Sequence, residues 1–139
     1  MECTLTIHPL FFIYMYSLLK DFYKAAQEDG DTSRIEIIYV SSDRDAQEFG
    51  NNFQSMPWLA LQSQHFKSLL SKKCQVQGIP TLVVLNAKTG YFVTDKAREQ
   101  VTRVGGNKEK VMSLIQEWKS VEAVPLEEAT FSSGGCAIL

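Results

Sequence analysis

Residues Cys74 to Gly90 read CQVQGIPTLVVLNAKTG and contain the strand on which the predicted fold depends. Thr81 to Leu85 (TLVVL) is an almost unbroken apolar run rich in β-branched residues, which is typical of a strand covered on both faces. Asn86 to Gly90 has turn chemistry and predicts a hairpin that returns through Tyr91 to Thr94. The stretch therefore predicts a strand pair that is entered through a proline turn.

Helical and strand patterns alternate on both sides of this hairpin. We expect a helix over Tyr14–Glu28, a buried parallel strand over Ile35–Val40, a helix capped by Ser41, Ser42 or Asp43, an irregular segment over Ser55–Leu61, a helix from Ser63 to Lys73, a short strand over Gln100–Val104, and a helix that Asn107 caps and that buries Val111, Leu114, Ile115 and Trp118. This alternation predicts an α/β fold.

Composition excludes several classes of protein. The chain has 139 residues, 14 Lys plus Arg and 16 Asp plus Glu, so one domain with a real core is expected and nucleic acid is not an expected partner. Cys3, Cys74 and Cys136 lie too far apart in sequence for a cysteine-based metal site, and neither a metal nor a cofactor is expected. His8 and His65 have no visible nucleophile beside them. The sparse cysteines favour a reducing, cytoplasmic location.

The apolar run Pro9–Leu19 is too short to cross a bilayer. It resembles a signal-peptide core, but the residues before it contain Glu2 and no Lys or Arg. We therefore do not expect secretion.

Three stretches carry motifs that rarely occur together by chance. They are YVSSDRDAQEF (Tyr39–Phe49), MPWLAL (Met56–Leu61) and CQVQGIPTLVVLNAKTG (Cys74–Gly90). Together they resemble the tryparedoxin and nucleoredoxin family of thioredoxin-fold thiol-disulfide oxidoreductases. The resemblance implies a thioredoxin-like three-layer sandwich, with helices on both sides of a central mixed sheet, over residues 1–119. Within that domain residues 1–13 are atypical, as in a truncated or altered start.

The resemblance also implies a binding site at Gly78, Ile79, Pro80 and Thr81. In the family this proline is cis and faces the catalytic disulfide, and the backbone before it pairs with the substrate chain. Without the resemblance a trans bond would be expected, since only about 5 to 6% of bonds before proline are cis. The expected partners are protein thiols or disulfides, or extended peptide segments.

The cysteine pair that gives the family its activity is absent from this chain. The family carries Trp-Cys-Pro-Pro-Cys before its first long helix, and aligning Phe12 and Met15 places the two cysteines near Thr6 and Pro9. The chemistry needs one thiol acidified at a helix N-terminus and a second that resolves the mixed disulfide. The family is a protein-disulfide reductase family, but we expect this chain to be inactive as written and assign it no catalytic residue.

Neither Cys3 nor Cys74 replaces the missing pair. Cys3 lies several residues too early and has no partner three residues on. Cys74 stands where the family tends to have an aromatic core residue, so it is interpreted as a small buried hydrophobe, with a lone redox-sensitive thiol as the alternative.

The family places a leading strand between the Ile35–Val40 and Thr81–Leu85 strands. Only residues 1–13 are available for it. Within them Thr4–His8 (TLTIH) shows a weak alternation of polar and apolar residues, and it is the candidate for this strand. Otherwise two strands would expose unpaired edges. Two explanations of the missing cysteines stay open: they were lost, or the start of the chain is altered or misassigned and a fuller chain carries them.

Residues 120–139 are expected to be a flexible, mildly acidic tail that ends in a prenylation motif. Cys136-Ala137-Ile138-Leu139 fits the pattern of Cys, two aliphatic residues and a selector, and a final Leu favours geranylgeranyl. The alternative is an unmodified apolar end. Since residues 120–139 contain no Lys or Arg, we expect partial, reversible, peripheral membrane association.

Two functions follow from these observations. One is a disulfide reductase by descent that is inactive as written. The other is a non-catalytic peptide-binding module, tethered to membranes through Cys136, that offers the groove beside Ile79 and Pro80.

Overall fold

The structure is a computed structural model. It describes residues 2–6, 13–28, 35–41, 45–62, 64–77 and 81–132, and for residues 2–6 and 13–15 it describes the backbone alone.

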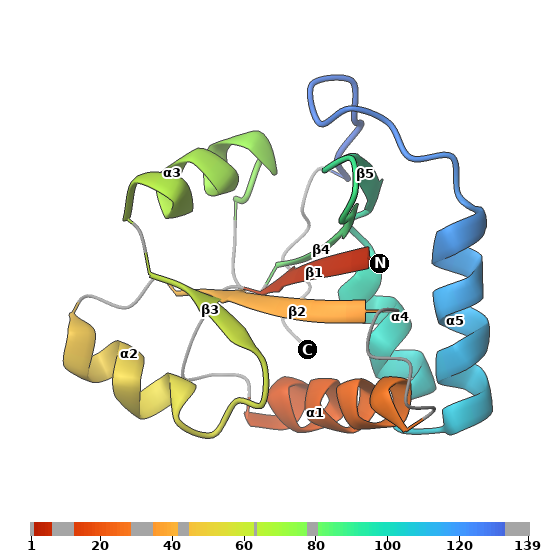
Figure 1. Ribbon diagram of the computed structural model, residues 1–139, viewed down its shortest axis with the longest axis horizontal. Coiled ribbons are helices and arrows are strands. Elements are labelled where there is room, and N and C mark those ends of the chain that lie inside the picture. Colours follow the sequence, from red (N-terminus) through yellow and green to blue (C-terminus); the bar gives the residue numbers. More distant parts are fainter. Residues whose placement is uncertain are drawn as a thin grey trace.

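A mixed five-stranded sheet in the order β3-β2-β1-β4-β5 runs through the centre of the molecule (Figure 1). Its strands are β1 (Glu2–Thr6), β2 (Ile35–Val40), β3 (Leu59–Leu61), β4 (Leu82–Asn86) and β5 (Phe92–Thr94). β2 pairs parallel with both β1 and β3, whereas β4 pairs antiparallel with both β1 and β5. The predicted leading strand is therefore present as β1, in the predicted position between β2 and β4, although it begins two residues earlier than Thr4.

The strands bury alternate side chains on the two faces of the sheet. In β2, Ile37 and Tyr39 contribute to one buried cluster, whereas Val40 contributes to the other. In β4 the same alternation separates Val84 from Val83. Because side chains in a strand point to opposite faces with a period of two, an unbroken apolar run is the pattern of a strand covered on both sides. The prediction for these two strands is confirmed.

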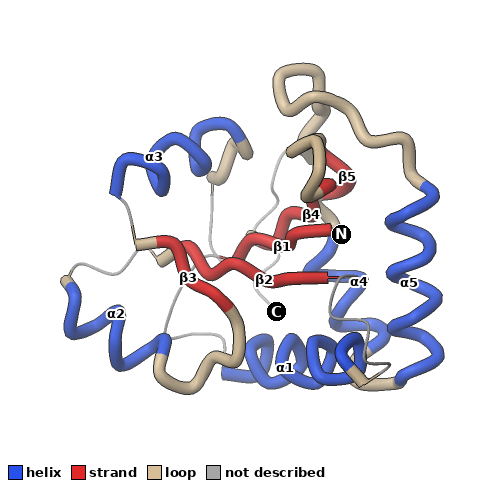
Figure 2. Tube along the Cα trace, in the orientation of Figure 1, coloured by secondary structure: helices blue, strands red, loops and turns tan. Residues whose placement is uncertain are grey.

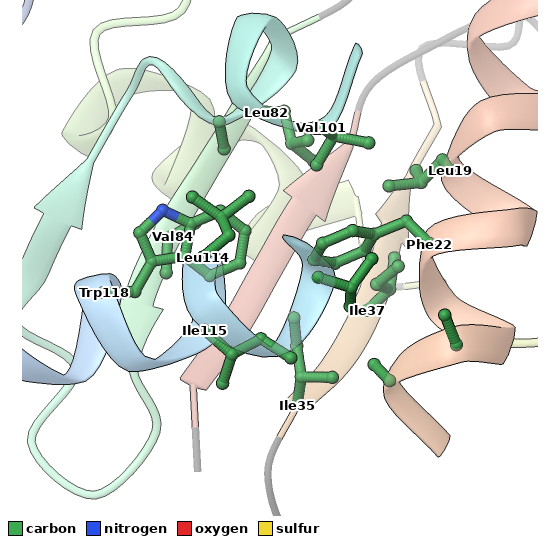
Figure 3. Close-up of a cluster of buried hydrophobic side chains, with 14 of the residues drawn as sticks. Leu19, Phe22, Ile35, Ile37, Leu82, Val84, Val101, Leu114, Ile115 and Trp118 are labelled. Atoms are coloured by element: carbon green, nitrogen blue, oxygen red, sulfur yellow. The ribbon is translucent and has the colours of Figure 1, made fainter. Parts of the chain in front are cut away.

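Helices cover the first face of the sheet. They are α1 (Ile13–Gln27), α4 (Ala97–Val104) and α5 (Lys108–Ser120), which contact one another, and α2 (Ala46–Phe53), which packs at the side. Figure 3 shows Phe22 of α1 and Trp118 of α5 among the side chains that fill this layer; their ring centroids are 5.7 Å apart. Full burial of one large apolar side chain stabilises a fold by roughly 1.5 to 3 kcal/mol, so this layer dominates stability.

The second face is covered by helix α3 (Gln64–Lys73) and by the chain that follows α5. Its buried residues are Val40, Cys74, Val83 and Phe92. Figure 2 shows the segment after α5 as a loop that turns back beside β5. Residues 121–132, expected to begin a flexible tail, thus lie against the sheet because their apolar side chains cover Phe92. Residues 133–139 lie outside the described part of the chain.

Several predicted elements are confirmed and others need correction. The helix after Asn107 has the predicted cap, because the Asn107 side chain accepts a hydrogen bond from the Lys110 N–H at 3.1 Å. The strand predicted over Gln100–Val104 is wrong: these residues belong to α4, in which Ala97 and Val101 are buried one turn apart, and Gly105 ends the helix with φ 56°.

Two further corrections concern α2 and the segment after it. The cap of α2 is Asp45, not Ser41, Ser42 or Asp43, and its carboxylate accepts from the Glu48 N–H at 2.8 Å. The segment Ser55–Leu61, expected to be irregular, contains β3, because pairing with β2 extends Leu59–Leu61.

Candidate functional site

The candidate site lies where the three parallel strands end. β1, β2 and β3 end at Thr6, Val40 and Leu61, and the chain continues from each of them into a helix. Since parallel strands end at the same edge of a sheet, this edge gathers the loops that precede α1, α2 and α3. Binding sites of α/β proteins form at such edges.

The register of the sheet places the two predicted halves of the site side by side. Thr6, the position assigned to the first family cysteine, pairs with Leu82 across the β1–β4 ladder. Thr81, the last residue of the predicted binding motif, directly precedes Leu82. The end of β1 and the end of the motif are therefore neighbours, but a threonine stands at the end of β1 and has no thiol. Gly78, Ile79, Pro80 and Pro9 lie outside the described residues, and the cis bond stays a prediction.

Neither Cys3 nor Cys74 supplies this edge with a reactive thiol. Cys3 pairs with Glu36 and Leu85 within the sheet, three residues before the end of β1, which is about 10 Å at the rise of a strand. Cys74 is 1% exposed, and burial raises the pKa of its thiol from 9.0 to about 11. A thiol of that pKa stays protonated at neutral pH and is a poor nucleophile. The interpretation of Cys74 as a buried hydrophobe is confirmed, and Cys136 lies outside the described residues.

An aromatic stack lies beside the end of β2. The ring of Tyr39 stacks on Phe49 and Phe53 of α2, with centroids 6.0 and 6.3 Å away. The Lys67 ammonium of α3 lies 5.3 Å from the centroid of Phe49, within the range of a cation–π contact. The stack therefore joins α2 to α3 around the edge. The one-turn spacing of Phe49 and Phe53 was visible in the sequence, but nothing there indicated Lys67.

Trp58 supports this region from the first face. It is 4% exposed and meets Tyr23 edge-on at 5.8 Å. The Tyr23 hydroxyl donates to the Glu36 carboxylate at 3.1 Å. Burial first, and then the charge and hydrogen bond of Glu36, raise the pKa of Tyr23 above 10.0. Within the described residues Trp58 Nε1 has no hydrogen-bond partner, so this indole acts here by packing.

The described residues offer little to other kinds of chemistry. His65 is exposed on α3. Among the described side chains no group of His, Cys, Asp and Glu is placed to hold a metal ion. In the same part of the chain no helix is long and apolar enough to cross a membrane.

The fold, and the edge at which β1, β2 and β3 end, can be compared with those of known families of proteins. The family model described as thioredoxin-like matches residues 14–92, which is more than half of the chain. The chain belongs to the thioredoxin-like family.

Individual relatives are nucleoredoxins and tryparedoxins, the two groups that the sequence motifs resemble. Nucleoredoxin of Mus musculus is 42% identical over 86 residues, which cover 60% of this chain and 19% of that one. Tryparedoxin of Trypanosoma brucei brucei is 33% identical over 86 residues, covering 60% of this chain and 58% of that one. A solved tryparedoxin II, in complex with glutathionylspermidine, is 29% identical with a TM-score of 0.66 over 73% of this chain and 72% of that one. The resemblance to tryparedoxin and nucleoredoxin is confirmed.

The similarity has a limited extent. This chain spans about a fifth or less of the length of the nucleoredoxins it matches. The family match begins at residue 14, after the segment in which the cysteine pair was expected. What the similarity supports is the thioredoxin fold and kinship with redox oxidoreductases.

Proposed function

We propose that this chain is a thioredoxin-fold protein of the disulfide reductase type that does not turn over dithiols as written. One observation carries the proposal: β1 ends at Thr6, and Thr6 is opposite Leu82, where the loop of the binding motif enters the sheet. A hydroxyl at this position does not form a mixed disulfide, Cys3 lies three residues earlier in β1, and the buried Cys74 thiol stays protonated at neutral pH. In a reducing cytoplasmic compartment such a protein contributes binding and not electron transfer.

An insulin-reduction assay tests the absence of turnover. Purified chain and a tryparedoxin that retains its cysteine pair are compared at equal concentration, with dithiothreitol as reductant. We expect the tryparedoxin to accelerate insulin precipitation and this chain to match the buffer blank. Turnover above the blank would overturn the proposal, and Cys74→Ala would then show whether Cys74 or one of Cys3 and Cys136 carries it.

The second function is capture of an extended peptide beside Ile79 and Pro80, as the family resemblance implies. It is supported by the start of β4 at this edge, next to the end of β1. The backbone of a loop that precedes such a strand is suited to pair with an extended chain. Protein segments that carry thiols or disulfides are the expected partners.

A pair of proline variants tests this capture. The probe is carboxymethylated insulin B chain, an extended polypeptide without free thiols, and binding is measured by fluorescence anisotropy. We expect Pro80→Ala to weaken binding about tenfold, by analogy with the loss of a well-placed contact. Pro57→Ala is the matched control, because Pro57 is exposed before β3. Equal binding by the two variants would remove the groove from the proposal.

Membrane tethering through Cys136 completes the proposal. Ser132, the last described residue, is exposed, and the motif Cys136-Ala137-Ile138-Leu139 begins four residues later in the sequence. The acidic residues Glu122, Glu127 and Glu128 do not favour an anionic leaflet, so one geranylgeranyl group would give reversible association. The test is intact mass and fractionation after expression in cells with an active prenylation system, with Cys136→Ser as control. A wholly soluble, unmodified protein would contradict tethering.

A further inference from the structure

Residues 121–132 form a segment, here called the strap, that is held to the second face by a few separate contacts. Val124 and Phe92 exchange backbone hydrogen bonds of 2.7 and 3.1 Å in an isolated antiparallel bridge. The Phe131 ring meets the Phe92 ring edge-on at a centroid distance of 4.8 Å. The strap therefore pairs with the outer edge of β5 and covers its one buried aromatic side chain.

Two polar contacts hold the strap to the rest of the domain. At its end, the Ser132 N–H donates to one oxygen of the Asp95 carboxylate at 2.6 Å, and the Ser132 hydroxyl donates to the other at 3.2 Å. In its middle, the Glu127 carboxylate lies 3.5 Å from the Lys73 ammonium at the end of α3. Lys73 directly precedes Cys74, which belongs to the buried cluster on which the strap residues pack.

The contacts of the strap differ in kind from those of the first face. The strap residues that pack against the second-face cluster are all only partly buried: Val124, Leu126, Ala129 and Phe131. The Lys73–Glu127 pair is exposed on both sides and contributes little. The remaining backbone hydrogen bonds of the strap are local: the Val121 N–H donates to Trp118 at the end of α5, and within the strap Glu128 donates to Pro125 and Ala129 to Leu126. Segments with few buried contacts and exposed hydrogen bonds open locally at lower free energy than the whole domain.

We propose that the strap is a detachable cover: it opens as a unit while the sheet and the first face stay folded, and its opening uncovers Phe92 and the Cys74 thiol. Cys74 lies in the same buried cluster as Phe92, and the strap residues pack on the outside of that cluster. With the strap closed, Cys74 is inaccessible and protonated. With the strap open, the thiol meets water and its ordinary acidity returns, so its reactivity reports the strap.

Alkylation of Cys74 in the folded protein tests the proposal. The full chain is treated with iodoacetamide at pH 8, and label on the Cys74 peptide is quantified by peptide mass mapping, which separates it from Cys3 and Cys136. Phe131→Ala removes the ring on Phe92 and should raise the labelling rate about tenfold. Asp95→Ala releases Ser132 and should raise it severalfold.

Two control variants separate strap opening from general destabilisation. Tyr91→Ala changes an exposed neighbour of Phe92 that makes no side-chain contact with the strap among the described interactions. Ile115→Val weakens the first face, on the other side of the sheet. Both should label at a rate within about twofold of the unaltered chain in the absence of denaturant.

The urea dependence of labelling supplies a second measurement. Because the slope scales with the surface that an opening exposes, opening of the strap predicts a much shallower slope than global unfolding. Unchanged labelling in both strap variants would overturn the proposal. It would equally fail if Ile115→Val accelerated labelling as much as Phe131→Ala, or if labelling followed the full urea dependence of unfolding.

Discussion

The two faces of the sheet differ in what holds them together. On the first face Phe22, Ile115 and Trp118 are essentially inaccessible, and helices from three parts of the chain enclose them. On the second face a small cluster around Cys74 and Phe92 is closed by one helix and by the partly buried strap. The difference teaches that the first face sets stability, whereas the second face, where Cys74 leads towards the Gly78–Thr81 motif, is the one free to open.

The largest expected effect concerns the first face. Phe22→Ala should lower the free energy of unfolding by about 3 to 5 kcal/mol, because it leaves a cavity against Trp118 and the sheet. Urea unfolding followed by tryptophan fluorescence measures this. Lys24→Ala, on the exposed side of α1, is the control and should change stability by less than about 0.5 kcal/mol. A loss near 1 kcal/mol for Phe22→Ala would remove the contrast between the faces.

Substitution of Cys74 tests the stability of the second face. Cys74→Ser should lower the free energy of unfolding by about 1 to 3 kcal/mol, since it places a hydroxyl in a buried apolar cluster. Cys74→Ala is the control, because it removes the thiol without adding a polar group, and should be better tolerated. If serine proved as stable as cysteine, the thiol would not be buried as described.

The sequence predicted those parts of the contrast that depend on local patterns, and missed those that depend on contacts between distant segments. The first face followed from local patterns: the stripe through Val111 and Trp118, and the almost unbroken apolar run Ile35–Val40. The sequence predicts a strand where α4 forms because Val101 and Val104 favour strands by propensity, whereas the packing of α4 on α1 and α5 is a tertiary effect.

The second face and the site depended on contacts between distant segments. β3 is too short to show a period, and it exists because β2 pairs with it. The strap shares the composition of a flexible tail, and only its contact with Phe92 marks it as ordered. At the site, the family resemblance predicted that Thr6 and Thr81 would be neighbours. Spacing did not predict it, because a register between segments 75 residues apart leaves no local signal.

A smaller effect is expected from the strap itself. Phe131→Ala should lower the free energy of unfolding by about 1 kcal/mol, since the ring is only partly buried and its site is open to water. Urea unfolding at pH 7 measures it, beside Phe22→Ala. Phe131→Leu is the matched control and should recover part of the loss by retaining apolar contact with Phe92. A loss as large as that of Phe22→Ala would make the strap part of one continuous core and would end the comparison.

The smallest expected effect is a loss of stability at alkaline pH, to which each face contributes one titrating group. Cys74 of the second face has its pKa raised by burial from 9.0 to about 11, and Tyr23 of the first face has its pKa raised from 10.0 by burial and by Glu36. A group whose pKa is raised by folding stabilises the protein fully below its unfolded pKa, and this contribution is lost as the pH rises through the folded value. Stability should therefore begin to fall near pH 9 because of Cys74, and further above pH 10 because of Tyr23.

Single variants assign each part of this alkaline loss to a face. Urea midpoints are measured between about pH 8 and 11, over which the thiol and then the phenol titrate. Cys74→Ala should remove the part that begins near pH 9, whereas Tyr23→Phe should leave that part and remove the later one. The strap limits access of water to Cys74. In the Phe131→Ala variant the pH at which stability begins to fall should therefore move towards the value found for Cys74→Ala. An onset unaffected by Cys74→Ala would show that the second face already admits water when it is closed.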